Sequence, residues 1–262
     1  MSAPRLETRP TIDRTWLERA ARDEPLTHAY ALWDLDRAPQ TVRFVSAVRG
    51  EETVGYLLVW LGRTDQPVVH WFGPPGLADR LVRELPRPPF VAVVPPAVGP
   101  AISAAFPRSP STPLKMMVRG PGGLPPSEAP VRRLGREDQA RLSELLRGPA
   151  EPDLSGYVGL DLESEPTWGA FDGERLVGVA RAAVRLPRIW VVGGVFVEPD
   201  RRDEGLGRGL VSAVVEAAER TGARTGLYVR ADPGPAMWLY EGLGFREVGR
   251  RLAFDVRPPA GP

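Results

Sequence analysis

Hydrophobic and polar positions alternate with periods that change along the chain, and these changes predict its elements. Near the start, amphipathic stretches opening at Trp16 and running from His28 to Leu35 predict two helices. Residues 41–49 and 53–61 alternate with a period of two around a turn after Gly50, which predicts a β-hairpin. Two more strands and a short helix are expected at Val68–Phe72, Phe90–Val94 and Leu77–Leu85, respectively. The first half is therefore expected to be a small mixed sheet with helices.

Proline and glycine separate this half from the rest. Between Arg108 and Pro130 the chain contains SPSTP, GPGG and LPPSEAP, which cannot continue a helix or a central strand. An apolar run within it, Leu114 to Val118, is expected to close the first sheet as an edge strand. We place the boundary between about Gly120 and Pro130. The prediction is a first domain, a linker and a second domain: residues 1–120, 121–130 and 131–257.

The second half has a different order of elements. Gly135 to Arg147 has the pattern of an amphipathic helix, and Asp172-Gly173 marks the turn of a hairpin formed by residues 168–171 and 176–184. Ile189 to Val197 is nearly continuously apolar, as expected of a central strand buried on both faces. A helix, a strand, a helix and a final strand should follow at residues 205–220, 225–229, 235–243 and 250–256.

Composition narrows the class of protein. Of 262 residues, 42% are hydrophobic and 26% charged, which is typical of a soluble globular chain. The net charge of +1 does not favour a nucleic-acid partner. No cysteine is present, which excludes disulfides, thiolate metal sites and an acyl-cysteine intermediate. We expect a cytoplasmic protein without a membrane partner, because no stretch has the length and hydrophobicity of a signal or membrane segment.

The most informative segment is VFVEPDRRDEGLGRGLVSAVVEAA, from Val195 to Ala218. A buried strand ends at Val197, and Gly205 and Gly207 open a helix whose first N–H groups form a site for a phosphate or pyrophosphate. The segment is not a Walker loop, and the dinucleotide fingerprint G-x-G-x-x-G is absent. A nucleotide hydrolase or a nicotinamide enzyme is therefore disfavoured. The motif alone is equally compatible with a simple turn between a strand and a helix that requires glycine and binds no ligand.

A second segment, AMWLYEGLGF from Ala236 to Phe245, places Tyr240 on a helix that follows a strand. By itself, such a tyrosine is more often a core residue than a catalytic one. Its position about thirty residues after a phosphate-binding helix favours a functional interpretation.

Together these two segments resemble the GNAT superfamily of N-acetyltransferases. Arg202, Gly205 and Gly207 fit the family's loop of Arg or Gln, two residues, Gly, one residue, Gly or Ala, and Leu239-Tyr240 precedes Gly244-Phe245 as in the family. The resemblance implies an α/β (α+β type) fold in which a twisted mixed sheet flanked by helices is splayed between its fourth and fifth strands. The first half resembles a degenerate second copy, as in tandem members, because GPPGLADRL carries prolines where a phosphate loop needs free N–H groups.

The resemblance also implies a site and a reaction. The donor would be acetyl-CoA, the backbone of Phe196 and Val197 would pair with its pantetheine arm, and Tyr240 would protonate the departing thiolate. The primary amine of a small-molecule acceptor would attack directly in a ternary complex, without a metal. The pyrophosphate would be held by backbone N–H groups of the loop, for which the candidates are Arg202, Asp203, Gly205, Leu206, Gly207 and Arg208.

Two positions depart from the family pattern. Asp203 and Glu204 stand where relatives commonly have Gly-Arg, and Pro233 stands where they commonly have asparagine. Acids near a diphosphate are expected to weaken coenzyme binding. The alternative is that they pair with Arg201, Arg208 or another arginine and fix the loop.

The general base and the acceptor stay open. Asp161, Glu163 and Glu165 lie where the family closes its acceptor pocket, although loop acids are mostly solvated, and a water-mediated route fits equally well. The two histidines, His28 and His70, are expected to be structural. Four tryptophans are candidates for lining an acceptor pocket, although tryptophans mostly belong to cores: Trp33, Trp71, Trp168 and Trp238.

Two other functions compete with an acetyltransferase. The first is a non-catalytic module that binds acyl-CoA as a sensor or scaffold. The second is an aminoacyl-tRNA-dependent transferase, which the net charge and the intact glycine loop disfavour.

Overall fold

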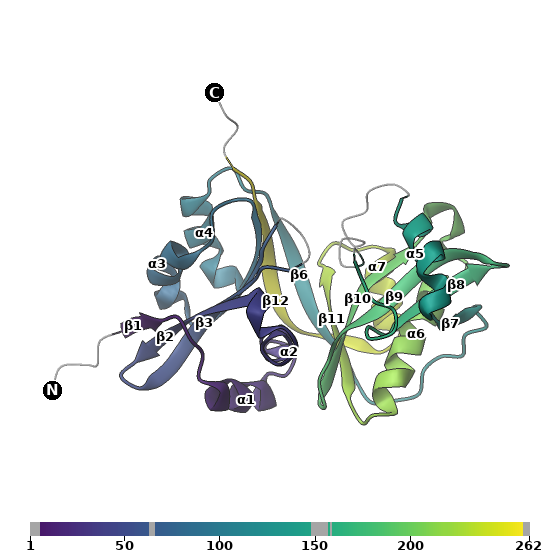
Figure 1. Cartoon of the computed structure of the whole chain (residues 1–262), viewed down its shortest axis with the longest axis horizontal. Coiled ribbons are helices and arrows are strands. Elements are labelled where there is room, and N and C mark those ends of the chain that lie inside the picture. The colour runs from purple at the N-terminus through teal and green to yellow at the C-terminus, as the bar shows by residue number, and fades with distance from the viewer. Residues whose placement is uncertain (1–5, 63–65, 148–156, 158, 259–262) are drawn as a thin grey trace. The chain divides into compact units, whose positions relative to one another are not determined.

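The structure is a computed structural model that describes residues 6–62, 66–147, 157 and 159–258 (Figure 1). The chain folds into two compact units, residues 1–115 with 249–262 and residues 116–248. The domain limits expected from the sequence, residues 1–120 and 131–257, remain a prediction. They differ from the compact units chiefly at the last strand, whose final residues pack with the first unit.

The first unit is a mixed sheet covered by helices on both faces. Its strands lie in the order β1-β2-β3-β4-β5-β12, with β4 and β5 parallel and the other described pairs antiparallel. The strands are β1 Leu6–Arg9, β2 Val42–Arg49, β3 Glu52–Trp60, β4 Val68–Phe72, β5 Phe90–Val94 and the end of β12 Phe245–Val256. The helices are α1 Arg14–Asp23, α2 Ala29–Arg37, α3 Ala78–Leu81 and α4 Gly99–Ala105, with 3-10 turns at Pro39–Thr41, Pro75–Leu77, Val82–Glu84 and Pro96–Val98.

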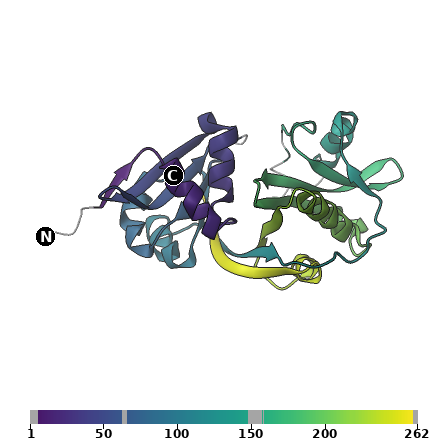
Figure 2. The ribbon, with the colours of Figure 1, turned by 90° about the horizontal axis from the view of Figure 1, so that it is seen from below.

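Alternation along β2 and β3 explains why helices cover both faces. Val45 and Leu57 pack against α3 and α4, whereas Phe44 and Tyr56 pack against α1 and α2. Successive side chains of a strand point to opposite faces, so one pair of apolar strands supplies both cores. Figure 2 shows the strands of this unit between the two groups of helices.

The second unit is built around β10. Its strands continue in the order β11-β10-β9-β8-β7, with β6 on the other side of β11. They are β6 Ser111–Arg119, β7 Val131–Arg133, β8 Thr167–Asp172, β9 Arg175–Arg185, β10 Ile189–Val197 and β11 Arg224–Arg230. The helices are α5 Gln139–Leu145, α6 Leu206–Glu219 and α7 Pro235–Gly242, with 3-10 turns at Arg136–Asp138 and Pro199–Arg201.

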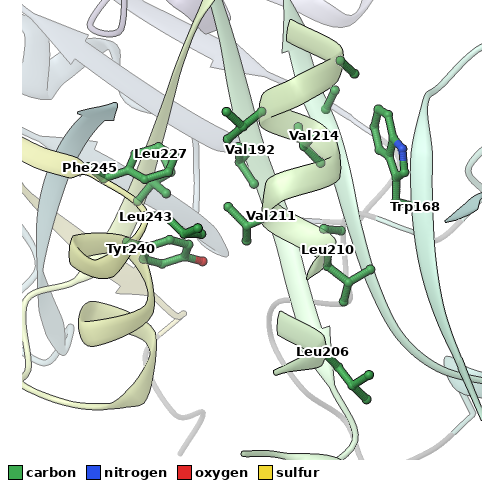
Figure 3. Packing of buried hydrophobic residues seen from close by; sticks show 14 of the residues in the cluster. Trp168, Val192, Leu206, Leu210, Val211, Val214, Leu227, Tyr240, Leu243 and Phe245 are labelled. Carbon is green, nitrogen blue, oxygen red and sulfur yellow. The ribbon is translucent and has the colours of Figure 1, made fainter. Parts of the chain in front are cut away.

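Two cores hold this unit together. Helix α6 buries Leu210, Val211 and Val214 against one face of the sheet (Figures 2 and 3). On the other face, Leu142 of α5 packs with Tyr157 in a second cluster. Burial on both faces is the reason why β10 is apolar along nearly its whole length.

Most expected elements are confirmed within a residue or two of their bounds. The final strand, however, begins at Phe245 rather than at Arg250, and the helix expected from Gly135 begins at Gln139 after a 3-10 turn. Three further features differ. The segment around Leu114–Val118 is a strand, yet it is not an edge strand, because β6 has β12 on one side and β11 on the other. The sequence analysis missed the short strands β1 and β7, and also α4, whose sequence GPAISAA begins with residues that rarely occur in helices. Among the described residues, no helix is long and apolar enough to cross a membrane.

Candidate active site

Strand β10 diverges from its neighbour β11. The two strands pair in parallel only at Ile189 to Val191, opposite Arg224 to Gly226. In the described residues beyond that point, β10 keeps only its antiparallel partner β9. Unpaired backbone groups must find other hydrogen-bond partners. From Val192 to Val197, β10 therefore offers the backbone groups of alternate residues to an extended ligand, and the expected pantetheine contacts Phe196 and Val197 lie on this stretch.

A bulge interrupts β10 within this stretch. The register with β9 shifts between Gly193 and Phe196, and Gly194 has φ 60°, in the left-handed region that favours glycine. The hydroxyl of Tyr157 donates to the Gly194 carbonyl at 2.6 Å. A Cβ atom on Gly194 would lie 2.5 Å from the Tyr157 ring, so the bulge requires glycine. The sequence analysis did not identify Tyr157; the double glycine in IWVVGGVFV was the available signal.

The loop after β10 ends in a helix N-terminus with free donors. Asp203 and Gly205 have φ values of 66° and 78°, and they turn the chain into α6. The first helical hydrogen bond runs from the N–H of Gly209 to the Gly205 carbonyl at 3.1 Å. The N–H groups of Leu206, Gly207 and Arg208 therefore have no acceptor within the helix. Together with the helix dipole, they form a site suited to a phosphate group.

Gly207 leaves the entrance to these donors open. A Cβ atom there would make only ordinary contacts, 3.5 Å from Leu239 Cδ2 and 3.9 Å from Val197 Cγ2. The contact with Leu239 also shows that α7 lies against the start of α6. Gly209 is different, because its Cβ would lie 2.6 Å from the Cβ of Ala129. Gly209 thus allows the segment expected to be a linker, residues 121–130, to pack closely on α6. The sequence motif alone did not distinguish this packing role from phosphate binding.

Glu204 is held by an arginine. The guanidinium of Arg201 donates from Nε and Nη2 to the two carboxylate oxygens at 2.8 and 2.9 Å, and it also pairs with Asp172 in the β8–β9 turn. These hydrogen bonds lower the pKa of Glu204 and raise that of Arg201. Of the two alternatives for Glu204, the structure has the ion pair that fixes the loop. Asp203 is exposed, and its positive φ helps to turn the chain into α6.

An open pocket of about 740 Å³ lies beside this loop. Its walls combine the loop and the start of α6, the β8–β9 turn, and the segment before β7. The lining residues include Arg201, Glu204, Gly205, Leu206 and Arg208 of the loop, Phe171 to Gly173 of the turn, and Pro126 to Pro130. The pocket thus brings the expected phosphate-binding residues together with residues 126–130, which were expected to belong to a linker.

Tyr240 lies on α7 and is 8% exposed. Its ring packs edge-on against Phe245, with ring centroids 5.8 Å apart, within the same core as Val211 and Val192. Figure 3 shows its hydroxyl oxygen directed from α7 toward α6 and β10. Tyr240 is therefore a core residue whose polar end faces the strand that diverges from β11.

The acidic and histidine candidates are not among the described residues that line the pocket. Asp161 accepts from the Ser164 hydroxyl and the Glu163 N–H, which lowers its pKa, and Glu163 is 3.9 Å from Arg136. Glu165 approaches Arg181 at 3.5 Å. His28 and His70 belong to the first unit, where burial lowers the pKa of each to about 4.

The tryptophans do not form one group. Trp71 and Trp168 are buried in the cores of different units, and Trp238 is 66% exposed on α7. Trp33 lies beneath the guanidinium of Arg37. No cluster of His, Cys, Asp and Glu suited to a metal ion is found among the residues that the structure describes.

Comparison with known proteins matches part of the second half to a family. Residues 137–245 match the family model "Acetyltransferase (GNAT) family". The chain is 30% identical to a mycothiol acetyltransferase of Kocuria rhizophila over 158 residues, covering 50% of this chain and 52% of that protein. The chain therefore spans about half the length of this relative.

Solved structures extend the likeness to the first half. A GCN5-related N-acetyltransferase from Sphaerobacter thermophilus has a TM-score of 0.64 at 17% identity, over 98% of both chains. A tandem GNAT protein from the clavulanic acid biosynthesis pathway has a TM-score of 0.60 at 18% identity, over 98% of this chain and 100% of that one. At these identities the likeness shows the fold. Residues 137–245 thus match the model of the GNAT acetyltransferase family, and the residues before them share the fold of these solved structures.

Proposed function

We propose that this protein transfers the acetyl group of acetyl-CoA to the primary amine of a small-molecule acceptor, by direct attack in a ternary complex. The family supports acyl transfer from acetyl-CoA. The single observation that carries the proposal is the junction of β10 and α6. There, the free N–H groups of Leu206, Gly207 and Arg208 meet a strand whose edge is unpaired.

This junction suits the two ends of the coenzyme. The pyrophosphate would accept from the α6 N–H groups, which Gly207 leaves accessible. The pantetheine arm would then run along β10 from Val197 toward the Gly193–Gly194 bulge. Its amide groups would pair with the free backbone edge, including Phe196 and Val197, as an added strand does. The Val197 carbonyl already accepts from Arg202 Nε at 3.2 Å, which leaves it one further lone pair.

The reaction needs a deprotonated amine and a protonated leaving group. The amine nitrogen forms a bond to the thioester carbon, and the C–S bond then breaks. The amine proton passes to water, and the thiolate takes a proton from the Tyr240 hydroxyl, which faces β10. The absence of cysteine excludes an acyl-cysteine intermediate and favours direct attack.

The acidic residues of the loop and Pro233 suggested the competing non-catalytic module. Arg201 holds Glu204 in a two-point ion pair, so the charge of Glu204 is partly balanced by the guanidinium. This pairing weakens the argument that Glu204 repels the diphosphate. The acetyltransferase is therefore the function that we propose.

Calorimetric titration with acetyl-CoA tests the proposal, followed by thiol release with a panel of amines. Gly207→Glu should weaken acetyl-CoA binding by about a hundredfold or more, because a carboxylate near a diphosphate is strongly repelled. The matched control is Gly76→Glu, at an open position of the first unit. Unchanged affinity in a folded Gly207→Glu variant would reject the phosphate site. Binding without turnover of any amine would instead support the non-catalytic module.

A further inference from the structure

We infer that the acceptor is a free amino acid whose carboxylate binds Arg181 beside the Gly193–Gly194 bulge. This inference rests on the proposed function, because it identifies the substrate class of the same site. It follows from the position of one arginine on the sheet, its unused hydrogen-bond donors and the surface next to it.

Arg181 lies on β9 directly opposite Gly193 of β10. Its neighbours Ala180 and Ala182 are buried in the core under α6. Because side chains alternate along a strand, Arg181 projects onto the opposite face. On that face Val179 packs with Tyr157, and the Arg181 guanidinium lies 5.7 Å from the centre of the Tyr157 ring. Arg181 thus lies on the face of the sheet away from α6, next to the bulge.

The strand position opposite Arg181 is a glycine, Gly193, and carries no side chain. A Cβ atom on Gly193 would meet a single neighbouring atom, the Cβ of Ala183, at 3.1 Å. Tyr157 covers Gly194 and fixes its carbonyl through the 2.6 Å hydrogen bond. A small molecule can therefore approach the guanidinium across Gly193 without displacing a side chain of β10.

Arg181 has hydrogen-bond donors to spare. A guanidinium carries five N–H groups. In the described part of the chain Arg181 makes one hydrogen bond, from Nη1 to the Glu165 carboxylate, at the long distance of 3.5 Å. Its Nε–H is buried without an acceptor, although its side chain is 21% exposed. A buried donor without a partner costs free energy, and a carboxylate would satisfy two parallel N–H groups at once.

The local charge favours an anion. Arg185 lies four residues along β9 on the same face and donates to the Ser164 carbonyl at 2.9 Å. On this surface lie the guanidinium groups of Arg181 and Arg185 and the carboxylate of Glu165, which is 3.5 Å from Arg181. The arginines attract a carboxylate, and the Glu165 carboxylate attracts the ammonium group of the same acceptor. A zwitterion matches both charges.

The position of Arg181 beside the bulge favours a short acceptor. The bulge is next to the point where β10 and β11 stop pairing, and under the proposed function the acyl end of the coenzyme lies there. A carboxylate held at Arg181 places an amine only a few bonds away within reach of the thioester. Amino acids meet this requirement, whereas amines without an anionic group leave the guanidinium unsatisfied.

The test compares amino acids with their carboxamides, which differ only in the charged group. Calorimetry in the presence of coenzyme A measures binding of each L-amino acid and its amide, and thiol release with acetyl-CoA measures turnover. The unsubstituted protein should prefer at least one acid over its amide by about 10- to 100-fold. Arg181→Gln should abolish this preference and leave acetyl-CoA affinity unchanged. Arg175→Gln, on the same strand but paired with Glu198, should behave like the parent.

Three results would overturn the inference. Acids and amides could bind or react equally well, the acid preference could survive in Arg181→Gln, or every amino acid could fail to bind. A different result would reject the proposed function alone: an acid binds with the expected preference, but no amine is acetylated. Turnover of amines without acid preference would reject the inference and retain the function.

Discussion

Asp203 has a strained backbone conformation in the loop between β10 and α6. It is the single described non-glycine residue with positive φ, and it precedes Gly205, which is also left-handed. For residues with a side chain this region costs roughly 1 kcal/mol, and Asp tolerates it better than most. The family's common glycine at this position has no such cost. The effect of Asp203 thus lies in its backbone as well as its charge.

Substitution at Asp203 should therefore separate backbone strain from charge. Asp203→Ala should destabilise the protein by about 1 kcal/mol, whereas Asp203→Gly should be nearly neutral, because lost strain offsets added freedom of the unfolded chain. Urea unfolding measures the difference. Asp200→Ala, at an exposed position of the preceding 3-10 turn, is the control and should change little. Equal stability of the Ala and Gly variants at residue 203 would contradict the strain argument.

Tyr240 combines a core ring with a hydroxyl directed at β10. Tyr240→Phe keeps the ring and removes the proton donor, so turnover should fall by about 10² to 10⁴ while acetyl-CoA affinity stays nearly constant. Tyr56→Phe is the control, because it deletes a buried hydroxyl bound to His28 in the first unit. A Tyr240→Phe variant as fast as the parent would leave Tyr240 a packing residue only.

At the scale of elements, the β10–α6 loop is fixed from outside by the β8–β9 hairpin. Arg201 links Glu204 in the loop to Asp172 at the hairpin turn. Exposed ion pairs contribute little by themselves, but a two-point pair restrains the loop whose N–H groups should bind the coenzyme. Glu204 is thus a positioning residue for the loop.

Replacement of Glu204 distinguishes positioning from repulsion. Glu204→Gln should weaken acetyl-CoA binding by about two- to fivefold, because the loop loses its ion pair with Arg201. Repulsion of the diphosphate by Glu204 predicts the opposite, tighter binding that is largest at low salt. Glu174→Gln removes the same charge from the neighbouring hairpin, where Glu174 pairs with Arg141, and should have no effect. Calorimetry at two salt concentrations decides between the two cases.

At the scale of the whole molecule, two strands divide between the compact units. The limits fall within β6, after Lys115, and within β12, after Val248. In the second unit, Met117 belongs to the core under α6, and buried Arg119 donates to the Leu243 carbonyl at 3.0 Å and pairs with Glu219. The second unit therefore includes residues that precede the proline-rich segment.

Truncation should reveal this dependence. A chain of residues 111–248 should fold and bind acetyl-CoA, whereas residues 127–248 should be less stable by about 3 kcal/mol or more, because they lack Met117 and leave Glu219 without Arg119. Urea unfolding followed by circular dichroism compares the two. Equal stability would show that β6 contributes nothing to the second unit.

The sequence by itself determined the local parts of the site. The apolar run of β10, the Asp-Gly hairpin and the glycines before α6 each follow from short-range rules of burial, turn geometry and helix termination. The resemblance to the GNAT family, carried by the loop and by Tyr240, rested on those same segments. For this reason the order of elements in the second half was predictable.

Only the tertiary structure decided which distant residues meet. Leu252 to Val256 of β12 pairs with Val94 to Phe90 of β5, and β6 lies inside the strand order rather than at an edge. Likewise, Tyr157 covers the Gly194 bulge, and Arg201 rather than solvent holds Glu204. These partners could not be read from the sequence, because hydrophobic period and turn signals specify the face that a residue presents and leave its long-range partner to the packing of the whole chain.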